Sequence, residues 1–109
     1  MIFELRTYWA APHKLDQLHH RFRTLTLPLF ARHGLQLVGF WTPAPPSAET
    51  GDLVYLLACP DQAALEAAWT AFVADPDWQA GAAVSEADGP LVAKVTSILL
   101  HATDYSPLT

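Results

Sequence analysis

Three side chains near the start of the chain carry groups that could do acid–base or oxyanion chemistry. Glu4, Arg6 and Tyr8 alternate with apolar residues in residues 2–9. On a β-strand successive side chains point to opposite faces, so these three would share one face, each about 7 Å from the next. Glu4 could then act as a general base while Arg6 holds an anionic or carbonyl oxygen. Tyr8 could donate a hydrogen bond to the same oxygen.

A structural role accounts for the same residues. Glu4 and Arg6 can form an ion pair that satisfies two partly buried charges, which is a common arrangement in proteins without activity at that place. Tyr8 can hydrogen-bond at the rim of a sheet and contact no ligand. The sequence alone leaves catalysis, binding and structural pairing open for this group.

The five histidines do not form a metal-ligand set. His19 and His20 are adjacent, so on a helix their side chains diverge by about 100°. His13, His33 and His101 fall in turns or at the ends of predicted elements, with no Glu or Cys at ligand spacing. We therefore predict no metal site and no cofactor.

An α+β fold must position these residues. Alternating side chains predict a strand at residues 2–9, and runs rich in apolar residues predict strands at 35–42, 52–59 and 91–101, the run at 52–59 being nearly continuous as in a central strand. Three- and four-residue apolar spacing predicts helices at 15–33 and 61–73, with a further helical segment from residue 75. The resulting order is strand, helix, strand, strand, helix, strand. We expect a ferredoxin-like βαββαβ antiparallel sheet with helices on one face, in a single domain spanning residues 1–109.

Particular residues predict where helices begin, end or break. Pro28 should kink or restart the first helix because its ring clashes with the preceding turn. Gly34 is a natural C-terminal cap. Asp61 and Asp75 are candidate N-caps, and Pro76 suits the first helical position, where a missing N–H costs nothing.

The helix-free face of such a sheet needs a cover. We expect Phe3, Leu5, Thr7 and Trp9 to pack on the helices, leaving Glu4, Arg6 and Tyr8 on the other face. A second copy of the chain is the obvious cover, since a large apolar face does not stay exposed to water. The prediction is a homodimer whose lumen is lined by Glu4, Arg6, Tyr8 and Trp41. Phe40 and Trp41 point oppositely, so one of the two faces this lumen.

Composition narrows the functional classes. The formal net charge is −5, from six Lys and Arg against eleven Asp and Glu, which argues against nucleic-acid binding. No apolar run reaches the roughly 18 residues that span a bilayer, so we expect no membrane insertion. Cys59 is the one cysteine, and at the end of an apolar run it resembles a buried small hydrophobe more than a nucleophile. A lone cysteine and a strand that begins at residue 2 predict a reducing, cytoplasmic location.

Six short motifs resemble, in order, those of the NIPSNAP family. They are Phe3-Glu4-Leu5-Arg6-Thr7-Tyr8, Leu27-Pro28-Leu29, His33-Gly34, Gly39-Phe40-Trp41, Asp75-Pro76-Asp77-Trp78 and Thr103-Asp104-Tyr105-Ser106-Pro107. Each is weak alone, but the ordered set spans nearly the whole chain. One departure is Val54-Tyr55-Leu56-Leu57-Ala58, which is more aliphatic than the His- and Trp-bearing third strand of many members.

The resemblance implies a dimeric α/β barrel, in which two ferredoxin-like sheets enclose a lumen. The wider superfamily includes cofactor-free monooxygenases, haem-degrading enzymes and lactone isomerases, so the resemblance is compatible with a haem ligand by analogy only. Three functions follow as hypotheses. The protein is a cofactor-free monooxygenase-like or isomerase-like enzyme, a binding protein for a small anionic or carbonyl ligand, or an interaction module whose dimer surface is the functional part.

Overall fold

The computed structural model describes residues 1–109 and contains four strands and a helical layer. The elements are β1 (Ile2–Ala10), α1 (Leu15–Arg21), the π-helical turn η1 (Phe22–Thr26), α2 (Leu27–Arg32), β2 (Gln36–Trp41), β3 (Leu53–Cys59), α3 (Gln62–Ala74), α4 (Pro76–Ser85) and β4 (Val92–His101). The strands form one antiparallel sheet in the order β2-β3-β1-β4. This topology confirms the predicted ferredoxin-like α+β fold.

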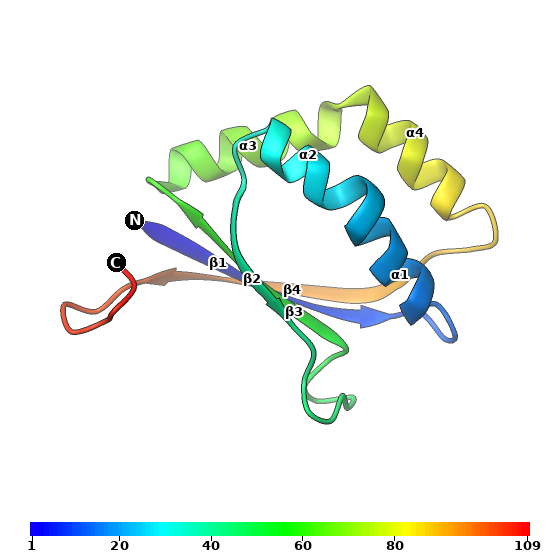
Figure 1. Ribbon diagram of the computed structural model, residues 1–109, viewed down its shortest axis with the longest axis horizontal. Coiled ribbons are helices and arrows are strands. Elements are labelled where there is room, and N and C mark those ends of the chain that lie inside the picture. Colours follow the sequence, from blue (N-terminus) through cyan, green and yellow to red (C-terminus); the bar gives the residue numbers. More distant parts are fainter.

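All helices lie on one face of the sheet (Figure 1). The segment α1-η1-α2 and the segment α3-α4 form two arms above the strands, while the opposite face of the sheet carries no helix. The core fills the space between the two layers and centres on Tyr55, Phe30, Leu18 and Leu57, which are almost fully buried. We call the helix-free side of the sheet the open face.

The first helical arm is interrupted where Pro28 predicts a break. The π-helical turn η1 comes directly before α2, and Pro28 occupies an N-terminal position of α2, where its missing N–H is tolerated. The arm ends at Gly34, which has φ +75°. There the N–H of Leu35 donates to the carbonyl of Phe30 over 2.9 Å and the N–H of Gly34 donates to the carbonyl of Ala31. These two bonds make a Schellman motif, which requires the left-handed conformation that glycine adopts most easily.

Both predicted aspartate caps are present. Asp61 accepts a hydrogen bond from the N–H of Ala64 at 2.8 Å, and Asp75 accepts one from the N–H of Asp77 at 2.8 Å. Pro76 takes the first position of α4, as expected. Asp61 therefore begins α3 and Asp75 begins α4, and these two helices form the second helical arm.

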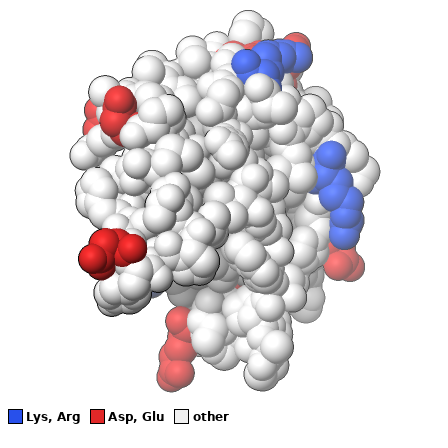
Figure 2. Space-filling model, turned by 60° about the vertical axis from the view of Figure 1, so that its left-hand side comes forward, with Lys and Arg blue, Asp and Glu red and all other residues white.

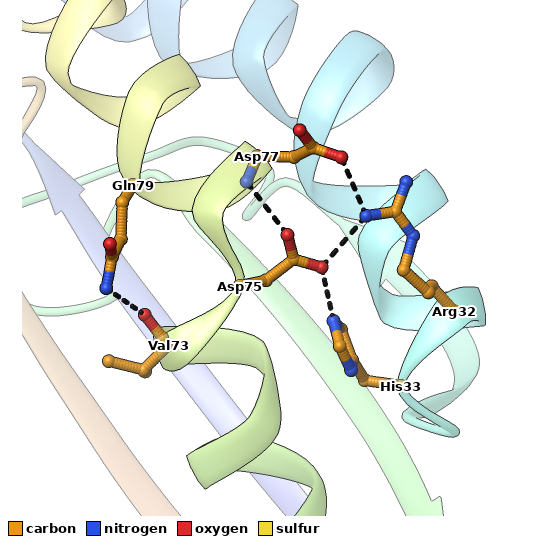
Figure 3. A network of polar contacts seen from close by, with 6 residues as sticks. All are labelled: Arg32, His33, Val73, Asp75, Asp77 and Gln79. Atoms are coloured by element: carbon orange, nitrogen blue, oxygen red, sulfur yellow. Dashed lines mark hydrogen bonds and ion pairs between the residues drawn. The ribbon is translucent and has the colours of Figure 1, made fainter.

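Asp75 also joins the two helical arms (Figure 3). Its Oδ2 accepts from Nε2–H of His33 at 2.6 Å and from Nη1 of Arg32 at 2.9 Å, and the same Arg32 atom reaches Asp77. The hydrogen bond from His33, the N–H of Asp77 and the nearby Arg32 lower the pKa of Asp75 to about 2, although burial works in the opposite direction. The cluster ties the end of α2 to the start of α4.

The expected orientation of β1 is wrong. Ile2 belongs to the core under the helices, and Tyr8 packs edge-on against Phe22 of η1, with ring centroids 5.4 Å apart. Glu4 and Arg6 both contact Trp69 of α3. The face that carries Glu4, Arg6 and Tyr8 therefore meets the helices. Alternation determines which residues share a face. The face that carries Glu4 and Arg6 can be buried because the helices supply a polar partner, the indole N–H of Trp69.

The open face carries the apolar set that was expected under the helices. Phe3, Leu5 and Thr7 lie opposite Leu100, Ile98 and Thr96 of β4 in register. Ile98 and Leu100 are 54% and 39% exposed in this single chain. Figure 2 shows one side of the molecule, where uncharged residues cover most of the surface and the charged side chains lie mainly toward its edges.

Candidate functional site

A cavity of about 350 Å³ lies between the sheet and the helices. Its walls come from β1, from the first helical arm and from α3 and α4. The lining residues are Arg6, Tyr8, Arg21, Phe22, Thr26, Phe30, Trp69, Phe72, Val73 and Trp78. Most of this surface is aromatic, and Arg6, Tyr8 and Arg21 supply the strongly polar groups. A mainly apolar wall with a few convergent polar groups is typical of small-molecule sites.

Glu4 anchors the polar end of the site without lining the cavity. Its Oε1 accepts from the indole Nε1–H of Trp69 at 2.6 Å. Its Oε2 accepts from Nη1 of Arg6 at 3.0 Å and from the hydroxyl of Ser97. Glu4 is only 4% exposed and both of its oxygens are engaged. This arrangement favours the structural ion pair over a general base.

Arg6 lies close to two aromatic rings. Its guanidinium carbon lies 4.5 Å from the ring centroid of Trp69 and 5.5 Å from that of Tyr8, both within cation–π range. Nη2 also donates to the hydroxyl of Tyr8 at 3.1 Å. Burial acts to lower the pKa of Arg6, but the phenols of Tyr55 and Tyr8 and the carboxylate of Glu4 outweigh it and raise that pKa. The guanidinium therefore stays charged, with donors left over for a ligand.

The hydroxyl of Tyr8 has a proton to offer to the cavity. Its oxygen lies 3.0 Å from the hydroxyl of Tyr55, which is fully buried. A buried hydroxyl that donates to nothing is costly, and the oxygen of Tyr8 is the acceptor within reach, so Tyr55 donates to Tyr8. Arg6 also donates to that oxygen, which uses both of its lone pairs. The proton of Tyr8 is then free to bind a ligand oxygen.

Tyr55 is a fixed partner with no acid–base role at neutral pH. Burial, reinforced by the neighbouring Tyr8, raises the pKa of Tyr55, so its phenol stays protonated. Its ring stacks on Phe40, with centroids 4.5 Å apart, and also contacts Phe22 and Phe30. The core therefore holds the hydroxyl of Tyr55 in place beneath Tyr8.

The sequence analysis placed Glu4, Arg6, Tyr8 and Trp41 together in one lumen, but the structure separates Trp41 from the other three. Glu4, Arg6 and Tyr8 form one connected cluster. Trp41 lies on the open face, where its ring covers Gly39, and Phe40 points to the helices. Trp41 thus faces the place where a lumen between two subunits would form, and its role there stays a prediction.

Several residues of the cluster went unrecognised as site residues. Tyr55 lies directly opposite Arg6 on β3, and Ser97 lies opposite Arg6 on β4. A lone phenol in an otherwise aliphatic strand was the available signal for Tyr55. Trp69 and Trp78 come from α3 and α4 of the helical layer. No signal in the sequence linked them to Arg6.

Two further observations concern metal binding and membrane-spanning helices. No three His, Cys, Asp or Glu side chains lie close enough together to hold a metal ion. None of the helices has the length and apolar character required to cross a bilayer.

The structure is that of a ferredoxin-like α+β protein with a cavity of about 350 Å³ beneath its helices. The sequence model of the NIPSNAP family matches residues 3–107. The chain belongs to the NIPSNAP family. A search of curated proteins found no match.

Solved structures agree with this assignment. An uncharacterised NIPSNAP domain protein from Burkholderia xenovorans superposes with a TM-score of 0.81 at 22% identity, over 98% of this chain and 99% of that one. A NIPSNAP family protein from Agrobacterium tumefaciens gives a TM-score of 0.84 at 18% identity, over 99% and 98%. A protein described as an antibiotic biosynthesis monooxygenase gives 0.60 at 17% identity, over 94% and 99%. At these identities the likeness extends to the fold alone.

Proposed function

We propose that the protein binds a small, flat organic molecule in the cavity between its sheet and its helices. The observation that carries this proposal is the pair of donors at one end of an aromatic cavity. The guanidinium of Arg6 and the hydroxyl of Tyr8 meet there, 3.1 Å apart. Together they suit a carbonyl, enolate or phenolate oxygen.

The surroundings of Arg6 support a fixed binding geometry. Glu4, Trp69 and Tyr55 each hold a member of the donor pair, so little side-chain entropy is lost when a ligand binds. Rings from Phe22, Phe72 and Trp78 complete the apolar part of the wall. A planar ligand fits such walls because stacked and edge-on ring contacts are both favourable.

Turnover would be a step beyond binding. The donors of Arg6 and Tyr8 could stabilise the oxygen of an enolate, as a cofactor-free isomerase or monooxygenase requires. A base would have to come from the ligand or from solvent, because both oxygens of Glu4 are engaged. The monooxygenase named above shares the fold and gives no further support.

A homodimer is part of the proposal. The open face exposes Trp41, Ile98 and Leu100 at 53%, 54% and 39%, and a second copy of the same face would cover them. In this arrangement the ligand cavity stays within each subunit, while Trp41 lines the space between subunits. A cytoplasmic location also stays a proposal, supported by the free and buried thiol of Cys59.

The alternative is a non-catalytic interaction module. The same exposed apolar open face favours it, since that surface can bind another protein as readily as a second copy. Under this alternative the Glu4–Arg6 pair is only structural. The two functions differ in whether a small molecule binds beside Arg6.

A thermal-shift screen of aromatic carbonyl and anionic compounds tests the proposal. Compounds that bind in the cavity should raise the Tm of the wild-type protein and lose that effect in the double variant Glu4→Gln/Arg6→Met and in Tyr8→Phe. Trp41→Ala is the control, because Trp41 lies on the other face of the sheet. A compound that stabilises all variants equally binds away from Arg6 and contradicts the proposal. No effect on wild type would favour the interaction module.

A further inference from the structure

A second arginine reaches the same cavity from the opposite layer. Arg21, the last residue of α1, is 8% exposed although it carries a full charge. Its guanidinium carbon lies 5.3 Å from the ring centroid of Trp78 on α4. Nη1 donates to Ser85 at 3.2 Å and to Glu86 at 2.9 Å. These contacts hold the guanidinium at the junction of α1 and α4.

Arg21 has donors that the protein does not use. Both of its hydrogen bonds come from Nη1, while Nε and Nη2 make none to the protein. A guanidinium has five N–H donors, so most of them remain for another partner. Arg21 lines the 350 Å³ cavity and also a wider groove of about 760 Å³ between α1 and α4. The side chain of Arg21 is therefore in contact with both spaces.

The counter-ions of the two arginines differ in how firmly they are fixed. The side chain of Glu4 is 5% exposed and is held by Trp69 and Ser97 as well as Arg6. The side chain of Glu86 is 43% exposed, lies just past the end of α4, and has Arg21 as its one ion-pair partner. Glu86 is exposed enough to turn into water, but the buried charge of Arg21 then needs another anion, which a ligand can supply. Glu4 is itself buried and held by three partners, so it stays on Arg6.

We infer that the ligand is a carboxylic acid that also carries a carbonyl or phenol oxygen, with its carboxylate at Arg21 and the other oxygen at Arg6 and Tyr8. The inference rests on the proposed function and adds which end of the ligand binds which arginine. The carboxylate forms a forked pair with the unused Nε and Nη2 donors of Arg21, and its charge competes with that of Glu86, which is bound at Nη1 of the same guanidinium. The second oxygen belongs to a neutral carbonyl or phenol, because the carboxylate of Glu4 already balances the charge of Arg6. The flat middle of the ligand lies among Phe22, Trp69 and Trp78.

Benzoic, phenylacetic and phenylpropanoic acids that carry an acetyl group on the far side of the ring are suitable probes, because the ring then lies between ketone and carboxylate. Each acid is paired with its methyl ester. The measurement is the Kd by isothermal titration calorimetry. The acid of at least one pair should bind wild type more tightly than its ester. Arg21→Met should weaken the acid by about tenfold or more, as expected for loss of a charge-assisted pair, and should change the ester little. Arg23→Met is the matched control, because Arg23 is exposed and does not line the cavity.

Glu86→Gln gives an independent result if Arg21→Met folds poorly. It keeps the shape of the side chain and removes the competing charge, so the acid should bind several-fold more tightly while the ester is unchanged. Equal effects of these variants on acid and ester, or weaker acid binding in Glu86→Gln, would overturn the inference. If acid and ester bind wild type equally and both are lost in the folded double variant Glu4→Gln/Arg6→Met, the proposed function stands and the carboxylate assignment fails. Absence of binding by every probe would contradict both.

Discussion

The indole Nε1–H of Trp69 in α3 donates to Oε1 of Glu4 in β1 over 2.6 Å. This contact joins residues 65 positions apart and turns the charged face of β1 toward the helices. It satisfies a carboxylate that would otherwise be costly to bury. The ring of the same tryptophan stacks on the guanidinium of Arg6. Trp69 thereby fixes both members of the ion pair at the end of the cavity.

The double variant Glu4→Gln/Arg6→Met should fold nearly as well as wild type. Replacing both members of a buried pair is often neutral, whereas the single variants leave one uncompensated charge and should each cost roughly 3–5 kcal/mol. Urea unfolding followed by circular dichroism measures these free energies. Additive losses, with the double variant less stable than either single variant, would show that Glu4 and Arg6 do not act as a pair.

Asp75 should make stability depend on pH in the acid range. Its pKa is about 2 in the folded protein and 3.8 ordinarily, so its ionised form stabilises the fold above about pH 4. This contribution is lost as the pH falls through about 2. Asp75→Asn keeps a good N-cap but removes the charge that holds His33 and Arg32. The Tm of this variant should lie below that of wild type at pH 6, and the gap should close toward pH 2.

Asp75→Ala removes the cap as well as the charge. Its Tm should be lower than that of Asp75→Asn at every pH at which both fold. Matching Tm values for the two variants would mean that the hydrogen bond to Asp77 contributes nothing. A gap between wild type and Asp75→Asn that widens on acidification would contradict the lowered pKa.

Gly34→Ala should destabilise the protein by about 1–2 kcal/mol through backbone strain alone. Gly34 has φ +75°, a region in which a Cβ crowds the backbone, and a Cβ built there meets no other atom within 4 Å. Chemical unfolding of the purified variant measures the loss. A variant as stable as wild type would show that the turn after α2 relaxes without cost.

Ile98→Asp should shift the protein from dimer to monomer. Ile98 is 54% exposed in the single chain, so the charge costs the monomer little but would be buried against a second open face. Sedimentation velocity over a range of concentrations measures the change. Val84→Asp on α4 is the control, since Val84 is 78% exposed on the helical layer. A wild-type protein that sediments as a monomer at all concentrations would remove the dimer from the proposal.

The sequence predicted the fold well because its signals are local. Apolar spacing located the strands and helices, and Asp61, Asp75 and Gly34 marked helix ends through bonds to residues within four positions. The site depends on distant partners instead. Alternation shows that Glu4 and Arg6 share a face of β1, but it does not show which face meets the helices. That depends on the register with Tyr55 and on the position of Trp69, which are distant in the sequence.

The most direct test of the cavity uses the four indole N–H signals of a ¹⁵N-labelled protein. Trp69 and Trp78 line the cavity, whereas Trp9 and Trp41 lie on the strand face that points away from the helices. During titration with a compound that raises the Tm, the account predicts shifts for Trp69 and Trp78 and none for Trp9 and Trp41. Shifts confined to Trp9 and Trp41 would place the ligand on the open face and contradict a site between sheet and helices.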